Sequence, residues 1–164
     1  MRLNPAATVV LPPLRERQMD MERLLTSMVQ KAIETPHLDE LLTEYCTQNS
    51  IGALPTGGTA VRAITGGDLP AQAPGVVLML FPERSMRQIR KHSWPGNLRE
   101  FAMTIENALM LCLAEAVDAA SREGRADVIQ VRPKLIRDLL LATAAEDDVD
   151  GGLRMEVRLR PGEG

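Results

Sequence analysis

The sequence predicts a mainly helical fold. Hydrophobic residues make up 45% of the chain but aromatic residues only 2%, so a core must be built from Leu, Ile, Val, Met and Ala. Such side chains favour packing of helix on helix over a β-sandwich. Hydrophobic residues also recur at helical spacing along several segments. The 164 residues are enough for one ordinary domain, or for a smaller domain with long connections.

The first elements in chain order are an extended segment and two helices. The apolar residues 8–10 and the Pro-Pro pair behind them predict a strand and a stiff linker. Asp20 is then placed as the N-cap of a helix that continues to Ile33. With Thr35 as N-cap and a proline at its first helical position, a second helix begins, and it fades by Asn49.

Residues 51–75 predict a loop or an insertion. They are rich in Gly, Pro, Thr and Ala and have no sustained period. Their two TGG tripeptides are not followed by Lys-Ser/Thr and a helix, so a flexible connection is favoured over a phosphate cradle. The next run, VVLMLF at 76–81, is either a short strand or an apolar loop, because periodicity does not separate the two.

The stretch HSWPGNLREF at 92–101 predicts a turn followed by the longest helix of the chain. A short helix with a basic outer face precedes it over 82–92. Pro95 and Gly96 are turn residues, and Asn97 is a preferred N-cap. Glu100 then falls at the third helical position and completes a capping box. Hydrophobic residues continue at helical spacing from there to residue 113.

Capping does not account for two residues of this stretch, Arg99 and Trp94. Arg99 falls at the second helical position, where the helix dipole disfavours a cation. A guanidinium beside the free amides of a helix start can bind a phosphate, whereas a surface ion pair is the alternative interpretation. Trp94, the one tryptophan, is expected to close the helical bundle at the turn.

The carboxy-terminal part predicts a helix over 133–144, an acidic linker and a short half-exposed strand over 153–159. A solvated edge strand is the favoured interpretation of that last segment, because charged edges prevent aggregation.

Composition excludes several functional classes. The net charge of -3 provides no general attraction to nucleic acid or to an anionic membrane. No apolar run is long enough to span a bilayer and no signal segment is recognised, so a cytoplasmic protein is expected. Cys46 and Cys112 lack the spacing of a metal site and are expected to be reduced thiols. His37 and His92 are isolated from any nucleophile, so no catalytic residue is predicted.

Two motifs resemble one known family. SWPGNLREFAMTIENAL at 93–109 resembles the sensor II helix in the AAA+ domain of bacterial enhancer-binding proteins, the activators of sigma-54 RNA polymerase, whose usual form is WPGNVREL followed by Asn. VVLPPLRER at 9–17, with Asp20 after it, is similar to the family's LPPLRxRxxDI passage between the α/β ATPase subdomain and the helical lid. The two motifs occur in the family's order, and the resemblance covers roughly residues 7–114.

The resemblance implies roles for individual residues. Arg99 corresponds to the sensor II arginine, which reaches the nucleotide phosphates and couples hydrolysis to lid movement. Arg15 and Arg17 match the hinge near the adenine, and Arg2 resembles an arginine that senses the nucleotide of a neighbouring subunit, although its spacing to the hinge is one residue longer than usual. The motif positions matched around Arg99 are Trp94, Pro95, Gly96, Asn97 and Glu100.

The resemblance also implies a domain plan and a fragment. The end of the ATPase subdomain and the hinge would occupy 1–19, the AAA+ helical lid with a loop insertion at 51–75 would occupy 20–114, and a helical extension and linker 115–164. The Walker A loop, the Walker B acidic pair and the GAFTGA loop that touches sigma-54 would all precede residue 1. The chain is therefore expected not to be an enzyme by itself and to hold no cofactor or metal alone.

The full-length parent implied by the resemblance would be a bacterial ATPase that uses ATP and Mg. Its partners would be further AAA+ subunits in a ring, sigma-54 RNA polymerase through the missing part, and DNA through a missing carboxy-terminal domain, with no membrane contact. Two alternatives fit the same residues. One is a stand-alone helical adapter that kept the lid fold, and the other is a DNA-binding module that uses residues 84–91 and 154–160.

Overall fold

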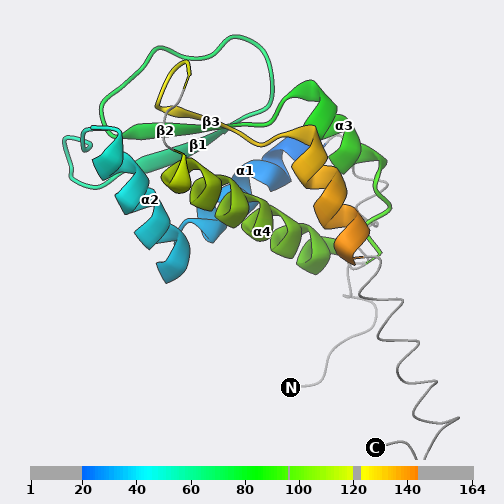
Figure 1. The fold of residues 1–164 in the computed structure, drawn as a ribbon. Coiled ribbons are helices and arrows are strands. Elements are labelled where there is room, and N and C mark those ends of the chain that lie inside the picture. The colour runs from blue at the N-terminus through cyan, green and yellow to red at the C-terminus, as the bar shows by residue number, and fades with distance from the viewer. Residues whose placement is uncertain (1–19, 96, 120–122, 144–164) are drawn as a thin grey trace, which may run out of the picture.

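The chain is mainly helical, with a small parallel sheet, in a computed structural model that describes residues 20–95, 97–119 and 123–143 (Figure 1). The mainly helical character predicted from the sequence is therefore present, but the fold is mixed, because a three-stranded parallel sheet that was not predicted packs with the helices. The AAA+ helical lid bundle stays a prediction. The predicted extended segment before residue 20 and the predicted strand over 153–159 lie outside the described residues. The elements are α1 (Met21–Ala32), α2 (Pro36–Gln48), β1 (Ala60–Ile64), β2 (Val76–Leu80), α3 (Glu83–Lys91), α4 (Asn97–Asp118), β3 (Val128–Gln130) and a last helix described over 133–143.

The first two helices begin where their capping residues predict. Asp20 is the N-cap of α1, and Thr35 is the N-cap of α2 with Pro36 at the first helical position. The Thr35 hydroxyl donates a hydrogen bond to the carbonyl of Ala32 at 2.7 Å, so it also closes the last turn of α1. Residues close to the helix ends are enough to predict these boundaries, because Pro36 fits the first turn of α2 and cannot continue α1.

The sheet has the order β1-β2-β3, and both pairs are parallel. The predicted loop over 51–75 is wrong for residues 60–64, which form the edge strand β1. Val61 is buried there, and its carbonyl accepts a hydrogen bond from the Gln30 side chain of α1 at 2.7 Å. Of the two alternatives for residues 76–81, the strand is the one observed, as the central strand β2.

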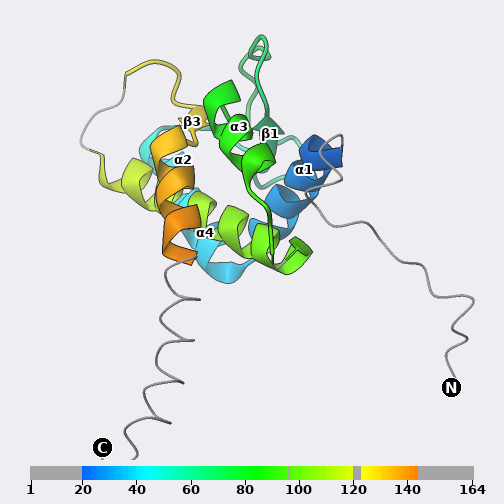
Figure 2. The same cartoon turned by 90° about the vertical axis from the view of Figure 1, so that its right-hand side faces the viewer.

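The helices α1 and α2 each pack against α4, and α1 also packs against β1 of the sheet (Figure 1). α3 and the helix over 133–143 lie side by side on another flank of the molecule (Figure 2). Ser85 of α3 is fully buried and donates a hydrogen bond to the carbonyl of Val131 at 2.7 Å. The hydroxyl satisfies a carbonyl that would otherwise be buried without a partner, which ties α3 to the chain behind β3.

The segment behind α4 shares one hydrophobic core with the predicted lid. Ile129, Val131 and Ile136 belong to the same buried cluster as the helices α1, α2 and α4. The boundary predicted after residue 114 falls inside α4, which continues to Asp118. The division into an ATPase end, a lid and an extension stays a prediction, but the described residues of the extension pack as part of the same unit.

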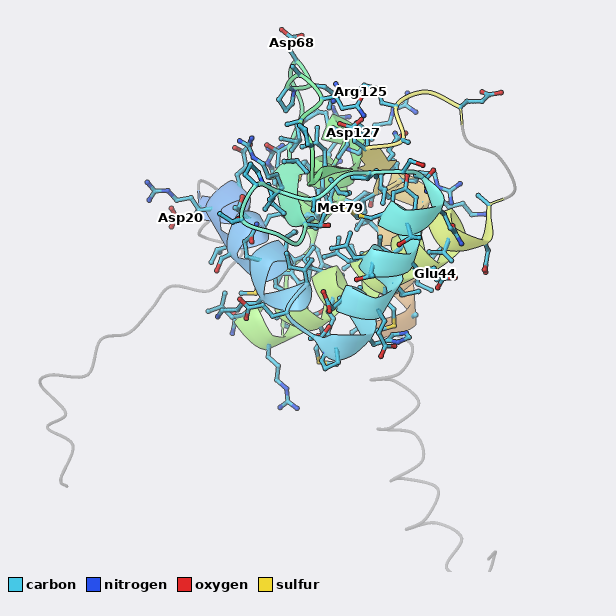
Figure 3. All side chains as sticks on the ribbon, turned by 90° about the vertical axis from the view of Figure 1, so that its left-hand side faces the viewer. Asp20, Glu44, Asp68, Met79, Arg125 and Asp127 are labelled. Atoms are coloured by element: carbon cyan, nitrogen blue, oxygen red, sulfur yellow. The ribbon has the colours of Figure 1, made fainter. Side chains whose placement is uncertain are left out.

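Two features fix the position of the residues between β1 and β2. Gly75, directly before β2, has φ 72, and an added Cβ would lie 2.2 Å from the backbone nitrogen of Leu54. Arg125 bonds both carboxylate oxygens of the buried Asp127 and donates a third hydrogen bond to the carbonyl of Pro70 at 2.8 Å. Figure 3 shows Arg125 and Asp127 below the loop that carries Asp68, which joins the parallel strands β1 and β2.

Candidate functional site

The candidate site is the turn between α3 and α4, and Trp94 anchors it. Its side chain is 1% exposed and is the largest of the fully buried side chains in the described residues. The indole Nε1 donates a hydrogen bond to the carbonyl of Ile89 in α3 at 2.8 Å. The indole also meets the ring of Phe101 in α4 edge to face, with centroids 4.9 Å apart. Trp94 therefore joins the end of α3 to the start of α4, in agreement with the expectation that it closes the bundle.

The backbone of this turn is in an uncommon conformation. Trp94 and Asn97 both have φ 51, and Ser50 is the only other non-glycine residue with positive φ in the described ranges. The left-handed region costs about 1–2 kcal/mol for most residues, and least for Asn. The backbone N–H of Asn97 donates a hydrogen bond to the backbone carbonyl of Trp94 at 2.8 Å, which closes the turn. α4 begins at Asn97 itself, so the predicted N-cap role of Asn97 is wrong, and Glu100 is the fourth residue of the helix rather than the third. An N-cap residue is normally extended, whereas Asn97 is left-handed.

A side-chain bond across the turn was missed by the sequence analysis. His92 Nε2 lies 2.8 Å from Glu100 Oε1, and the two side chains are only 20% and 10% exposed. An ionised carboxylate can only accept, so Nε2 carries the proton and donates it. The His92 ring also packs edge to face on Trp94, with centroids 4.6 Å apart. His92 was predicted only to be isolated from a nucleophile. Its contact with Glu100 was not predicted, because only the geometry of the turn brings together two residues eight positions apart.

Arg99, the central predicted residue, is exposed in the first turn of α4. Within 20–95, 97–119 and 123–143, no carboxylate forms an ion pair with its guanidinium. The surface ion pair that the sequence left open is therefore not formed by any described residue.

The other predicted site residues divide into two groups. Trp94, Asn97 and Glu100 lie together in the turn, and Pro95 is exposed beside them. Their roles as motif positions stay predictions. The residues that fall outside the described ranges are Arg2, Arg15, Arg17 and Gly96.

The basic face proposed for DNA contact is present on α3 as predicted. Arg84, Arg87 and Lys91 are exposed on it. Arg90 is only partly exposed, and it forms surface ion pairs with Glu83 at 2.9 Å and with Glu22 of α1 at 3.3 Å. The second half of the proposed DNA surface, residues 154–160, lies outside the described part of the chain. Exposed cations on a helix are the ordinary state of a solvated face.

The two cysteines are free and buried, as predicted for reduced thiols. Cys46 borders a shallow pocket of about 270 Å³ between α2 and residues 51–59, and Cys112 borders one of about 280 Å³ beside β3. Burial raises the pKa of both thiols, and that of Cys112 reaches about 12. Because the thiolate is the reactive form, neither is set up as a nucleophile at neutral pH.

Neither a metal centre nor a membrane-spanning helix is found among the described residues. No group of three or more His, Cys, Asp and Glu side chains there could hold a metal ion. None of the described helices combines the length and the apolar character needed to cross a membrane.

Comparison of the whole chain with protein-family models, curated proteins and solved structures finds no match.

Proposed function

We propose that this chain is the lid part of a bacterial sigma-54 activator, in which Arg99 contacts the phosphates of ATP and couples its binding and hydrolysis to remodelling of RNA polymerase. In this proposal the chain is not catalytically complete. The parent enhancer-binding protein supplies the ATPase subdomain, ATP and Mg, and works in the cytoplasm as a ring of AAA+ subunits.

The observation that carries the proposal is the position of Arg99. Its guanidinium is exposed in the first turn of α4, where the sequence pattern resembles the family's sensor II motif, and no described carboxylate neutralises it. The planar fork of a guanidinium matches phosphate oxygens, and the amides of a first helical turn add favourable dipoles. A cation at this position is unfavourable for the helix alone, so its presence is better explained by an external anion.

The mechanism we propose is a shift between two lid positions. A charge-assisted contact from Arg99 to the terminal phosphate exists with ATP and is lost or weakened after hydrolysis. The nucleotide then favours one lid position by the difference in contact energy between the two states. The anchoring of the turn by Trp94, which is buried between α3 and α4, lets a force on Arg99 move both helices together.

The test is to fuse the chain behind a complete ATPase subdomain of the family and to measure ATP hydrolysis. Arg99→Ala is expected to lower kcat/KM for ATP about 10- to 100-fold, since a hydrogen bond to a charged group contributes about 1.5–3 kcal/mol. The matched control is Arg87→Ala, which removes an equally exposed arginine from α3 that has no ion pair among the described residues. Equal hydrolysis by Arg99→Ala and the unmodified fusion would contradict the proposal.

A helical adapter is the second candidate, and exposed hydrophobic residues on α4 favour it. Met103 and Leu111 lie eight positions apart, hence on one face of the helix, and are 55% and 42% exposed. Such a face is suited to a protein partner. This candidate predicts that Met103→Ser with Leu111→Ser abolishes partner binding, whereas Arg99→Ala leaves it intact. A fusion that hydrolyses ATP in an Arg99-dependent way would instead support the lid.

A further inference from the structure

We propose that His92 and Glu100 form a latch across the turn between α3 and α4, and that this latch positions Arg99. For the task of Arg99 the inference rests on the proposed function, but the ordering of the turn can be tested without nucleotide. In this account His92 and Glu100 are positioning residues, and neither touches the phosphate.

The latch is a partly buried, charge-assisted hydrogen bond between the two ends of the turn. His92 is the residue directly behind α3, and Glu100 stands in the first turn of α4. Their 2.8 Å bond therefore spans all the residues that redirect the chain from one helix to the next. With side chains only 20% and 10% exposed, the pair is largely shielded from water, where such a bond is stronger than on the surface.

The turn needs such a constraint because its backbone is strained. Trp94 and Asn97 both occupy the left-handed region at φ 51. Non-glycine residues persist there only when surrounding contacts determine the conformation. Trp94 is held by its bond to Ile89 and by Phe101, which fixes the first half of the turn. The hydrogen bond between His92 and Glu100 constrains the second half of the turn, which includes the first residues of α4.

Arg99 is the direct chain neighbour of Glu100. Its long side chain reaches a ligand reproducibly only if the backbone of the first helical turn is fixed. Binding groups generally depend on such support from the residues around them. A displacement of about 1 Å can lower a rate by up to about 100-fold. Loss of the latch is therefore expected to act through Arg99, without removing any contact that Arg99 itself makes.

The first test measures ¹⁵N order parameters in the 164-residue chain. His92→Ala removes the donor, Glu100→Leu removes the acceptor, and Glu100→Gln keeps an acceptor oxygen. The first two variants are expected to lower the order parameter of the Arg99 amide from about 0.85 to below about 0.6, whereas Glu100→Gln keeps it high. Arg132→Ala, which breaks the Arg132–Glu115 ion pair near the other end of α4, is the control and should change nothing at Arg99.

Unchanged order at Arg99 in both His92→Ala and Glu100→Leu would overturn the latch, whatever the chain does with ATP. The same would follow if Arg132→Ala lowered the order as much. Amides of the buried part of α4, residues 104–113, serve as the internal check that each variant is folded, because they are expected to keep their order.

The second test asks whether the latch acts through Arg99 in the ATPase fusion. Glu100→Leu is expected to lower the kcat about tenfold when Arg99 is present and to have no further effect on the Arg99→Ala background. Equal losses on both backgrounds would mean that Glu100 has only a general structural role, which overturns the link to Arg99. If the turn loses order as expected but Arg99→Ala leaves hydrolysis intact, the latch stands and the proposed function fails.

Discussion

The turn at 92–100 and the segment at 51–75 carry similar turn-forming residues but are held in different ways. The segment at 51–75 contains β1 and is called the connection below. The turn is short, and a buried tryptophan, a partly buried hydrogen bond and two left-handed residues define it. The connection is long, and it is held at separate points by the pairing of β1, by Gly75 and by Arg125. Local contacts therefore specify the turn, whereas contacts from distant parts of the chain specify the connection.

The largest expected effect comes from breaking the anchor of the turn. Trp94→Ala should lower the free energy of unfolding by about 3–5 kcal/mol, because it leaves a cavity between α3 and α4 and removes the hydrogen bond from the indole to the Ile89 carbonyl. Urea unfolding followed by circular dichroism measures this, since the only tryptophan is lost. A loss below about 1 kcal/mol would show that the turn is not anchored by its indole.

The connection should be most sensitive at Gly75. Gly75→Ala combines a left-handed backbone with a Cβ only 2.2 Å from Leu54 N, so a loss of more than about 2 kcal/mol is expected. Gly57→Ala is the matched control, because its φ is 87 but its added Cβ would meet no atom within 4 Å. If both variants lost the same stability in urea unfolding, the close approach to Leu54 would not matter.

A smaller effect is expected where α2 meets the segment before β3. Tyr45 is fully buried, and its hydroxyl donates a hydrogen bond to the Ala126 carbonyl at 2.5 Å. Tyr45→Phe keeps the ring and removes the hydroxyl with its bond to Ala126, so about 1 kcal/mol should be lost. Hydrogen exchange at residues 123–128 should rise in the same variant. Stability equal to that of the original chain would show that this contact from a distant element is dispensable.

The smallest effect at neutral pH concerns Cys112, which lies on α4 far from the turn. Its pKa is raised by burial from 9.0 to about 12 in the folded chain. Below about pH 9 the thiol is protonated in both states and has no pH-dependent effect. Between pH 9 and about 12 only the unfolded state loses the proton, so stability falls as the pH rises. Urea unfolding over this range should show a shallower decline for Cys112→Ala, and parallel declines would contradict the raised pKa.

The helices could be predicted from the sequence because their signals are local. Asp20, Thr35 and the proline behind it mark helix ends through contacts within one turn, and α1 and α2 begin where these residues predict. The strands β1 and β3 could not be predicted because five and three residues have too little intrinsic preference. Both become strands by pairing with β2, which is a contact between distant segments.

The candidate site could be predicted only in part for the same reason. Trp94, Asn97 and Arg99 were singled out from residue types and from the family resemblance. The bond between His92 and Glu100 was missed because it depends on the left-handed backbone between them, which a Trp residue does not signal. Sequence patterns thus indicated where the turn lies, and the structure was needed to find what holds it.

The proposed lid function depends on the binding of nucleotide phosphates by Arg99. The most direct measurement is calorimetric titration of ATP into the ATPase fusion carrying either Arg99 or Arg99→Ala. We expect the substitution to raise the Kd for ATP about 10- to 100-fold, while Arg87→Ala leaves the Kd unchanged. Equal Kd values for Arg99 and Arg99→Ala would mean that Arg99 is an ordinary surface residue, and the proposed lid function would be wrong.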